Sequence, residues 1–342
     1  MLLTTENVAL EVVSAYVSKN RVTVEERLKN LVSEKKISRL KKGTGFESFS
    51  IADKNFCTSD FCSAAAEKIF AETEIKKSDI RAIIFITQTP DYILPATSHI
   101  LHNQLGLNRE CAAFDINLGC SGFVYGLYVA ASLIQNLEGK ILLLCGDTGT
   151  RNVHAEGIAG LSVFGDAGTA AIISKRQGQK IFFNIQTFGE LADTIIMPRG
   201  AYRNPFIVEN NSLNVPENFA SMDGAKVADF STKFVPQNMI DLMNSAQVEQ
   251  SDIGGFFLHQ ANRLLLQNIA EKLKIPEKKF PFKSARIGNT SSASIPVTLC
   301  EMARLNESVN FLSLLSGFGV GMSIASSIID LTNLICLPTG EI

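Results

Sequence analysis

The sequence predicts an α/β protein made of two related halves, in which strands alternate with helices. Short apolar runs bounded by turn residues, such as residues 112–116 and 255–258, predict buried strands. Two passages about half a chain apart, 77–90 and 250–263, resemble each other in sequence. Two packed βαβ-type halves explain both observations most simply.

The repeated passages are KSDIRAIIFITQTP and QSDIGGFFLHQANR, which share Ser-Asp-Ile, an apolar run and then a glutamine, Gln88 or Gln260. A helix-like segment follows each of them, at 96–105 and at 261–273. Because Ser-Asp-Ile is short, chance similarity stays open as the alternative explanation.

A weaker similarity joins 140–175 to 310–329, where an apolar strand, glycines and a second strand follow one another. The intervening segment 176–249 contains RGAYRNP and NNSLNVPENF, and such Asn- and Pro-rich stretches predict connecting loops. We therefore expect an N-terminal half at 1–175, followed at 176–342 by linking loops and the C-terminal half.

Cys120 stands where the strand 112–116 turns into a helix predicted over 123–133. In the first turn of a helix, unpaired N–H groups and the helix dipole favour an anion, so we expect the thiol to ionise easily. The thiolate would then be a nucleophile. The alternative is a structural role, since cysteine is among the most buried residue types.

Length and composition exclude several classes of protein. The 342 residues are 46% hydrophobic with a net charge of −2, which suits a large soluble core and gives no reason to expect nucleic acid. Seven scattered cysteines without paired spacing indicate a reducing, cytoplasmic setting. We expect neither a signal peptide nor a membrane span, because the N-terminal stretch lacks a basic region and no apolar run is long enough.

We also expect no metal site. His99 and His102 lie three residues apart on a predicted helix, but no further acidic or cysteine ligands are nearby in the sequence.

His259 and Asn289 stand in passages that point to chemistry. His259 directly follows the strand 255–258, and ligands of α/β proteins collect at such carboxyl ends. Asn289 lies in the turn of IGNTSSASIP, and GFGVG at 317–321 is a bend that lets backbone N–H groups approach a ligand.

Together with Cys120, these groups admit acyl transfer. A thiolate can take up an acyl group from a thioester, His259 and Asn289 can hydrogen-bond an enolate, and backbone amides can hold an oxyanion. Papain-like proteases share the Cys, His, Asn order and are an alternative. Their Cys-Gly-Ser-Cys-Trp signature is replaced here by Gly-Cys-Ser-Gly-Phe.

Five motifs carry a resemblance: DINLGCSGFVYGL, FGDAGTAA, HQANRLLLQNIAEKL, GNTSSASIP and GFGVG. In this order and spacing the chain resembles a β-ketoacyl-acyl-carrier-protein synthase III over nearly its whole length. The resemblance implies the thiolase fold, with two duplicated βαβαβαββ halves in a five-layered α-β-α-β-α arrangement and a homodimer. It implies decarboxylative condensation of an acyl group with malonyl-acyl-carrier protein, without a cofactor.

The resemblance also implies roles for individual residues. Cys120 matches the acyl-accepting nucleophile in the first half, and His259 and Asn289 match the pair in the second half that promotes decarboxylation of the malonyl thioester. The backbone N–H groups of Cys120 and Val320 match the oxyanion hole. Three further positions match the surroundings of the substrate: Phe318 beside the catalytic pocket, and Asn262 and Gly224 in the pantetheine tunnel.

The chain departs from the familiar initiating synthases in several places. It has no Trp, Gly43 beside Lys42 replaces the usual adenine-clamping Arg, and Arg151 lies one residue out of step with the second clamp position. We therefore expect the acyl donor to be an acyl-carrier protein, with acyl-coenzyme A left open. The stretch 87–98 looks more like synthases of specialised acyl or surface-polymer pathways.

A basic run at 271–286 predicts a docking surface for the acidic carrier protein. Arg263, Lys272 and Lys274 are its candidate contacts, and the alternative is a solvated helix end. Two other functions stay open: acyl transfer to a non-carbon acceptor, and an inactive partner subunit that binds carrier protein.

Overall fold

The computed structural model describes the whole chain, residues 1–342. Two long strands, β1 (Leu2–Val17) and β7 (Ala167–Thr187), pair antiparallel and run through both regions of the sheet. The first region adds three parallel strands, which are β6 (Lys140–Asp147), β4 (Ile80–Ile86) and β5 (Ala112–Ile116). β7 pairs with β6, and β5 is the outermost strand.

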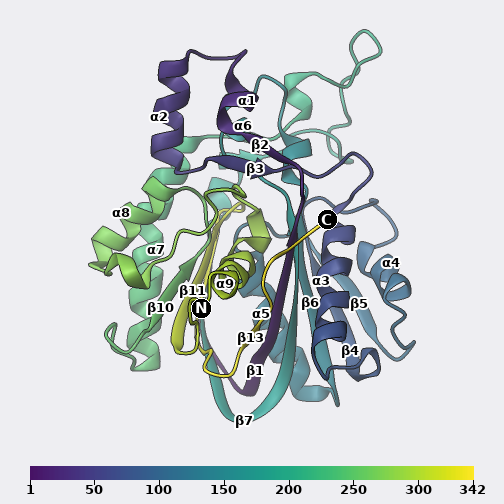
Figure 1. The fold of residues 1–342 in the computed structure, drawn as a ribbon, viewed down its shortest axis with the longest axis vertical. Helices are drawn as coiled ribbons and strands as arrows, with labels where there is room; N and C mark the ends of the chain where they lie inside the picture. Colours follow the sequence, from purple (N-terminus) through teal and green to yellow (C-terminus); the bar gives the residue numbers. More distant parts are fainter.

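The second region repeats this pattern. β10 (Gly255–Leu258) and β11 (Leu312–Gly319) are parallel, and β12 (Ser323–Asp330) runs antiparallel to β11. The first part of β7 pairs with β6 up to Ile173, whereas its last part, from Ile181, pairs with β12. The bent pair of β1 and β7 therefore joins the two regions, as Figure 1 shows.

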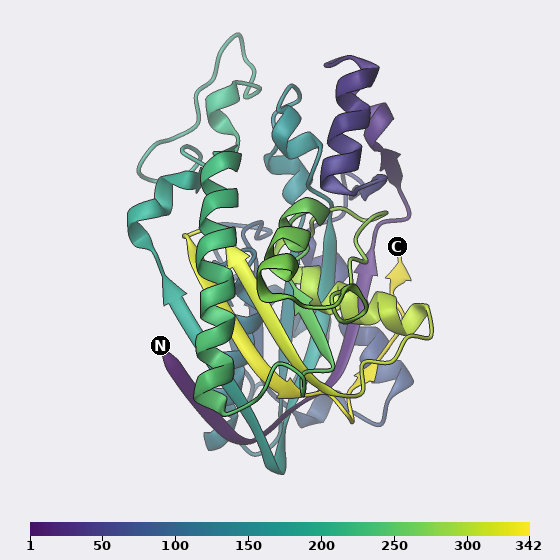
Figure 2. The same cartoon turned by 90° about the vertical axis from the view of Figure 1, so that its left-hand side faces the viewer.

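Helices cover both sheet regions and fill the space between them (Figures 1 and 2). The helices of these layers are α3 (Thr58–Glu72), α4 (Thr97–Gln104), α5 (Gly122–Leu133), α7 (Gly224–Ala246), α8 (Arg263–Leu273) and α9 (Ser294–Arg304). α3 and α4 contact the first region, and α5 contacts strands of both regions. α7 contacts the second region, and α8 packs against α7. The five-layered α-β-α-β-α arrangement is confirmed.

The helices α1 (Val24–Leu28), α2 (Glu34–Thr44) and α6 (Ile158–Leu161) gather at one end of the molecule with the two-stranded sheet of β2 (Arg21–Thr23) and β3 (Ser48–Ser50) (Figure 1). A second two-stranded sheet pairs β8 (Ile195–Ile196) with β9 (Ser221–Met222). Near the C-terminus, β13 (Ile335–Cys336) and β14 (Gly340–Glu341) pair with β1. No helix has the length and apolar character needed to cross a membrane.

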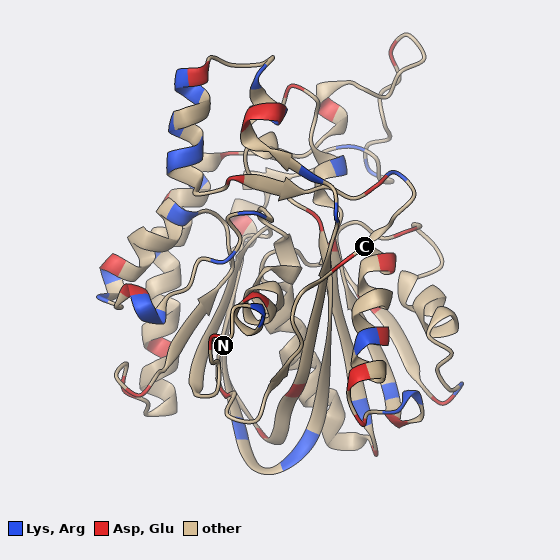
Figure 3. Cartoon of the chain, in the orientation of Figure 1, with Lys and Arg blue, Asp and Glu red and all other residues tan.

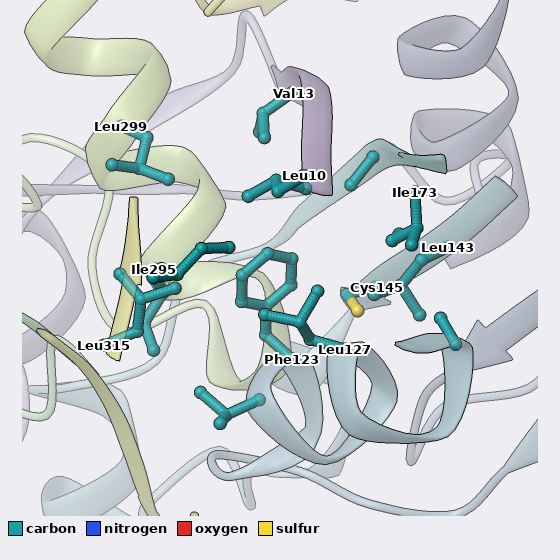
Figure 4. Packing of buried hydrophobic residues seen from close by; sticks show 14 of the residues in the cluster. Leu10, Val13, Phe123, Leu127, Leu143, Cys145, Ile173, Ile295, Leu299 and Leu315 are labelled. Atoms are coloured by element: carbon teal, nitrogen blue, oxygen red, sulfur yellow. The ribbon is translucent and has the colours of Figure 1, made fainter. Parts of the chain in front are cut away.

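α5 is the centre of the largest hydrophobic core, because it is apolar on all sides. Phe123 and Leu127 of α5 lie among side chains of β1, β6, β7, α9 and β11 (Figure 4). Gly126 lets β4 approach α5 closely, since a Cβ there would lie 2.3 Å from Cδ1 of Ile86. This packing fixes the start of α5, and with it Cys120, against both sheet regions.

The predicted elements that flank the site are confirmed. The strands 112–116 and 255–258 are β5 and β10, and the segments 96–105 and 261–273 contain α4 and α8. The segment 176–249 was wrongly predicted as loops: it holds the second part of β7 and the whole of α7. Most of its Asn and Pro residues lie within 198–218, so they indicate only the loop between β8 and β9.

The middle of α7 shows how a proline is accommodated in a helix. Pro236 has no N–H group to donate to the carbonyl of Thr232. The ammonium of Lys272 on α8 donates to that carbonyl at 3.0 Å instead. Lys272 therefore joins α7 to α8.

Candidate active site

Cys120 lies in the turn between β5 and α5, and only 8% of the residue is exposed. Ser121 is the N-cap of α5, whose first residue is Gly122. Cys120 therefore stands just before the helix and not in its first turn, where the sequence placed it. The apolar run begins the helix one residue earlier than predicted, but the nucleophile candidate still lies beside the helix end.

The turn between β11 and β12 packs directly on Cys120. A Cβ on Gly319 would lie 2.9 Å from Sγ of Cys120, so only glycine allows this approach. Ser121 and Ser323 share a hydrogen bond of 2.8 Å, and Ser323 also donates to the carbonyl of Val320 at 3.0 Å. This chain of hydrogen bonds ties the Val320 peptide to the residue that follows Cys120.

Burial raises the pKa of the Cys120 thiol to about 11. A hydrogen bond from the Val320 backbone and one with the Ser291 side chain oppose the shift, whereas the nearby carboxylate of Asp147 adds to it. The expectation of an easily ionised thiol is therefore wrong for the protein alone, because desolvation outweighs the helix end. With this raised pKa, the thiol is protonated at neutral pH.

His259 follows β10 and is 1% exposed. Its backbone N–H donates to the carbonyl of Ser316 on β11, and its ring meets that of Phe318 edge to face, with 5.6 Å between centroids. Burial lowers the pKa of His259 to about 3, and a hydrogen bond with the Ser291 backbone opposes this shift only partly. The imidazole is therefore neutral at physiological pH.

The tautomer of His259 follows from its contact with Ser294. Nδ1 of His259 lies 2.7 Å from Oγ of Ser294, which also accepts from the backbone N–H of Gln260 at 3.4 Å. Ser294 is fully buried and Oγ has no other partner, so its hydroxyl hydrogen is paired only if it donates to Nδ1. Nδ1 is then the acceptor, and Nε2 carries the proton as a hydrogen-bond donor.

Asn289 is held by backbone hydrogen bonds with Val163 and Gly165. Its N–H donates to the carbonyl of Val163 at 2.9 Å, and its own carbonyl accepts from Gly165 at 3.0 Å. The side-chain oxygen accepts from the backbone N–H of Ser291 at 2.8 Å. The amide NH2 group, which has no partner within the protein, is thus the end of Asn289 available in the cavity.

Asp147 is a buried carboxyl group at the end of β6. Its Oδ1 accepts from the Gln88 backbone N–H at 2.7 Å and from the Thr87 hydroxyl at 3.2 Å, and its Oδ2 accepts from Ser292 at 3.1 Å. Burial raises the pKa of Asp147 to about 6, and these hydrogen bonds limit the shift. Asp147 therefore fixes the end of β4 against the segment that carries Asn289.

One cavity of about 260 Å³ brings the predicted site residues together, and 14 of its 27 lining residues are hydrophobic. The predicted residues that line it are Cys120, His259, Asn289, Val320, Phe318, Asn262 and Gly224. Asn262 is the N-cap of α8, and its side chain accepts from the Leu265 N–H at 2.8 Å. Gly224 is the first residue of α7.

The candidate docking residues lie outside this cavity. Arg263 and Lys274 border a second hollow of about 460 Å³ on the outer side of α8, and Lys272 binds α7 as described above. No cluster of three or more His, Cys, Asp or Glu side chains is arranged to hold a metal ion.

Sequence reasoning missed several residues of the site. Gln88, Asp147 and Asn152 line the cavity, and Ser294 orients His259. Gln88 lies just beyond β4 and Asp147 ends the parallel strand β6, so the rule that ligands collect at carboxyl ends of strands could have found them. Ser294 carried no signal, because its partner lies 35 residues away in the chain.

Comparisons with known proteins agree on one family. A family profile described as 3-oxoacyl-[acyl-carrier-protein (ACP)] synthase III matches residues 114–189, and one described as the C-terminal part of the same enzyme matches 243–331. A putative 3-oxoacyl-[acyl-carrier-protein] synthase 3 of Campylobacter jejuni is 34% identical over 93% of this chain and 92% of its own. A β-ketoacyl-[acyl-carrier-protein] synthase III of Fusobacterium nucleatum is 34% identical over 84% of this chain and 88% of its own.

Solved structures agree with this similarity. The 3-oxoacyl-(acyl-carrier protein) synthase of Burkholderia xenovorans is 30% identical and superposes with a TM-score of 0.93, covering 100% of this chain and 99% of its own. The synthase III of Thermus thermophilus is 25% identical with a TM-score of 0.84, over 94% of this chain and 98% of its own.

Proposed function

Because the chain belongs to the 3-oxoacyl-[acyl-carrier-protein] synthase III family, we propose that it loads an acyl group on Cys120 and condenses it with malonyl-acyl-carrier protein. The observation that carries this proposal is the meeting of Cys120, His259 and Asn289 in one cavity beside the turn at Val320. Acyl transfer alone would need the nucleophile and the oxyanion donors, but not the two further donors of His259 and Asn289.

In the loading step, Sγ of Cys120 attacks the carbonyl carbon of the acyl thioester. The backbone N–H groups of Cys120 and Val320 hold the oxyanion, and the carrier leaves as its thiol with the proton from Cys120. The high pKa of the buried thiol means that the proton departs in the course of this step and not before it.

In the condensation step, the bond between the malonyl carboxylate and its neighbouring carbon breaks, and carbon dioxide leaves. Nε2–H of His259 and the NH2 group of Asn289 donate to the enolate oxygen that forms. The enolate carbon attacks the acyl carbon on Cys120, and Sγ is expelled as a thiolate when the new carbon–carbon bond forms. The thiolate then takes up one proton from water, which restores the thiol. The product is a 3-oxoacyl group on the carrier protein.

Intact-protein mass spectrometry tests the loading step. After incubation with acyl-carrier-protein and acyl-coenzyme A donors, the wild type should gain one acyl mass, and peptide mapping should place it on Cys120. Cys120→Ala should gain none, whereas the control Cys111→Ala should load normally. An adduct on another cysteine, or none with any donor, would contradict the proposal.

We infer that the donor is an acyl-carrier protein in preference to acyl-coenzyme A. The guanidinium of Arg151, the nearest candidate for an adenine clamp, donates to the carbonyls of Asp53, Lys54 and Phe56. The chain has no Trp to complete a clamp, and base stacking on such a side chain typically contributes about 1–3 kcal/mol. A micromolar Michaelis constant for an acyl-coenzyme A, unimproved by a carrier protein, would contradict this inference.

We propose that carrier protein docks on the basic face shared by α2 and α8, which contact each other (Figure 3). Four cations of the basic run are engaged within the chain: Lys272 with Thr232, Lys279 with Ile253, Lys283 with Glu307, and Arg286 with Glu47. Arg263, Lys274 and Lys278 form no ion pair, and α2 adds the exposed cations Lys35, Lys36, Arg39 and Lys42.

Charge reversal tests this surface without breaking the bond between Lys272 and α7. Arg263→Glu with Lys274→Glu should raise the Michaelis constant for malonyl-carrier protein in a salt-dependent manner and leave loading from a small acyl thioester intact. Carrier-protein kinetics that respond neither to this double change nor to salt would exclude the face.

We propose that the enzyme is a homodimer that joins at β5. β5 ends the sheet with a free edge, and the nearby loop exposes Tyr92, Ile93 and Leu94 by 63, 71 and 74%. Free edges and adjoining apolar side chains favour a partner. Light scattering should give twice 37.2 kDa for the wild type and a smaller mass for Ile93→Asp. A monomeric wild type would contradict the proposal.

A further inference from the structure

Gln88 is a polar side chain of the cavity that the mechanism does not use. It follows β4 and lines the same cavity as Cys120. Its backbone is fixed, because its N–H donates to the buried carboxylate of Asp147 at 2.7 Å. Its side-chain amide, in contrast, has no hydrogen-bond partner in the protein.

The amide of Gln88 lies beside the nucleophile. A Cβ built on Gly119 would meet Oε1 of Gln88 at 2.3 Å and Oγ of Ser291 at 3.2 Å, so the amide covers the residue that precedes Cys120. Because Gly119 directly precedes Cys120 and both Gln88 and Cys120 line the cavity, the amide forms part of the cavity wall beside the nucleophile.

Gln88 is one of several polar groups in the cavity. Thr89 also follows β4, Asn152 lies in the segment after β6, and Val163 and Phe164 are apolar residues of the same lining. The side chain of Asn152 likewise has no hydrogen-bond partner. In a mostly apolar pocket, a few placed polar groups decide which ligand fits.

We propose that Gln88 selects an acyl group that carries a hydrogen-bonding oxygen near the thioester, with the 3-hydroxyacyl class as its best match. An oxygen on the third carbon lies within reach of an amide held over Gly119. The amide can both donate to and accept from a hydroxyl group. This inference rests on the proposed function, since it assumes that acyl groups are loaded on Cys120.

A pocket with an unpaired amide disfavours an unsubstituted acyl chain and favours a hydroxylated one. An unsubstituted acyl chain would exclude water from the amide and leave the amide without a hydrogen-bond partner. A hydroxyl group on the chain would instead form a hydrogen bond with the amide in place of water. One neutral hydrogen bond contributes up to about 1.4 kcal/mol. This free energy corresponds to a factor of about ten in rate or affinity.

The test compares loading of Cys120 from 3-hydroxybutyryl and butyryl thioesters of the same carrier protein, followed by intact-protein mass spectrometry. The wild type should load the 3-hydroxybutyryl group about tenfold faster or more. Gln88→Leu should lose this preference and load the butyryl group at least as fast as the wild type does. The matched control is Asn268→Leu, another carboxamide of the cavity, on α8, which should change both rates by the same factor.

Equal rates for the two donors on the wild type would overturn the inference, whatever the variants do. An unchanged ratio in Gln88→Leu, or an equal change of ratio in Asn268→Leu, would overturn it as well. Failure of the wild type to load any donor would instead contradict the proposed function, so the two failures are distinguishable.

Discussion

The ends of β4 and β10 are equivalent in sequence but opposite in environment. Each strand is followed by one residue and then a glutamine, Gln88 after β4 and Gln260 after β10. Gln260 is fully buried: its amide donates to the carbonyls of Leu258 and Pro281 at 2.9 and 3.3 Å, and its oxygen accepts from the Lys283 N–H at 3.0 Å. Gln88 makes no side-chain hydrogen bond and borders the cavity.

This contrast indicates a division of labour. The end of β10 is closed by hydrogen bonds, and the residue before its glutamine, His259, is held in one tautomer as a donor. The end of β4 is fixed through its backbone and the hydroxyl groups of Thr87 and Thr89, which leaves the Gln88 side chain free for the substrate. The rigid end of β10 therefore suits the condensation step, which is the same for every substrate. The open end of β4 suits recognition of the acyl group, which varies between substrates.

The strongest test of the β10 side removes the donor that acts with His259. Asn289→Ala should slow condensation by about 10²–10³, because a positioned donor to a developing negative charge is lost. Loading of Cys120 should change little, since the enolate forms only in the second step. Single-turnover kinetics of both steps measure the difference, and equal losses would refute the separation of roles.

A smaller effect is expected from the residue that sets the tautomer. Ser294→Ala removes the hydroxyl that donates to Nδ1 of His259, so the proton can move from Nε2 to Nδ1. Condensation should fall by about 10–100-fold, as for other partners that orient a functional imidazole. Ser294→Thr keeps the hydroxyl group and should recover much of the condensation rate. If Ser294 had only a structural role, variants of equal melting temperature would show equal condensation rates, with or without the hydroxyl group.

Replacing each of the two glutamines tests directly whether the ends of β4 and β10 differ. Gln260→Leu leaves two carbonyls and one N–H without partners in a buried place, so the free energy of unfolding should fall by about 2–4 kcal/mol. Gln88→Leu should change it by less than about 1 kcal/mol. Urea unfolding measures both, and equal destabilisation would show that the two ends are alike after all.

A further effect concerns pH. The pKa of His259 is about 3 in the folded protein and near 6.5 when unfolded, so the unfolded state binds more protons between these values. His259 therefore makes stability fall as pH drops from about 6.5 towards 3, by at most about 1.4 kcal/mol per pH unit. Asp147, with its pKa raised to about 6, acts in the opposite sense between about 4 and 6.

His259→Gln should reduce the loss of stability on acidification within this window and leave the contribution of Asp147 in place. Urea unfolding midpoints at pH 4, 5 and 6 provide the measurement. Identical pH profiles for the wild type and the variant would show that His259 is not held neutral in the folded protein.

The sequence was most informative where local patterns determine local structure. The apolar runs located β5 and β10, and the motifs around Cys120, His259 and Asn289 identified residues that share one cavity. It failed for α7, because Asn and Pro cues in one loop were extended over a neighbouring amphipathic segment.

It also failed for the ionisation of Cys120. The helix end is a local feature visible in the sequence, but desolvation depends on everything packed around the thiol. The roles of Ser294 and Asp147 were hidden for the same reason, since their partners come from distant parts of the chain.

The shared pair of β1 and β7 has a consequence for how the protein folds. Residues 2–17 find their partners at 167–184, so the first strand of the chain can pair only after most of the first 180 residues have been synthesised. Contacts of such high sequence separation slow folding, because a long loop must close before they form. A fragment ending at residue 175 would contain β1 without the second part of β7 and would expose residues 2–6 of β1, which this part covers. The two halves should therefore unfold as one cooperative unit and should not be separable by truncation at their boundary.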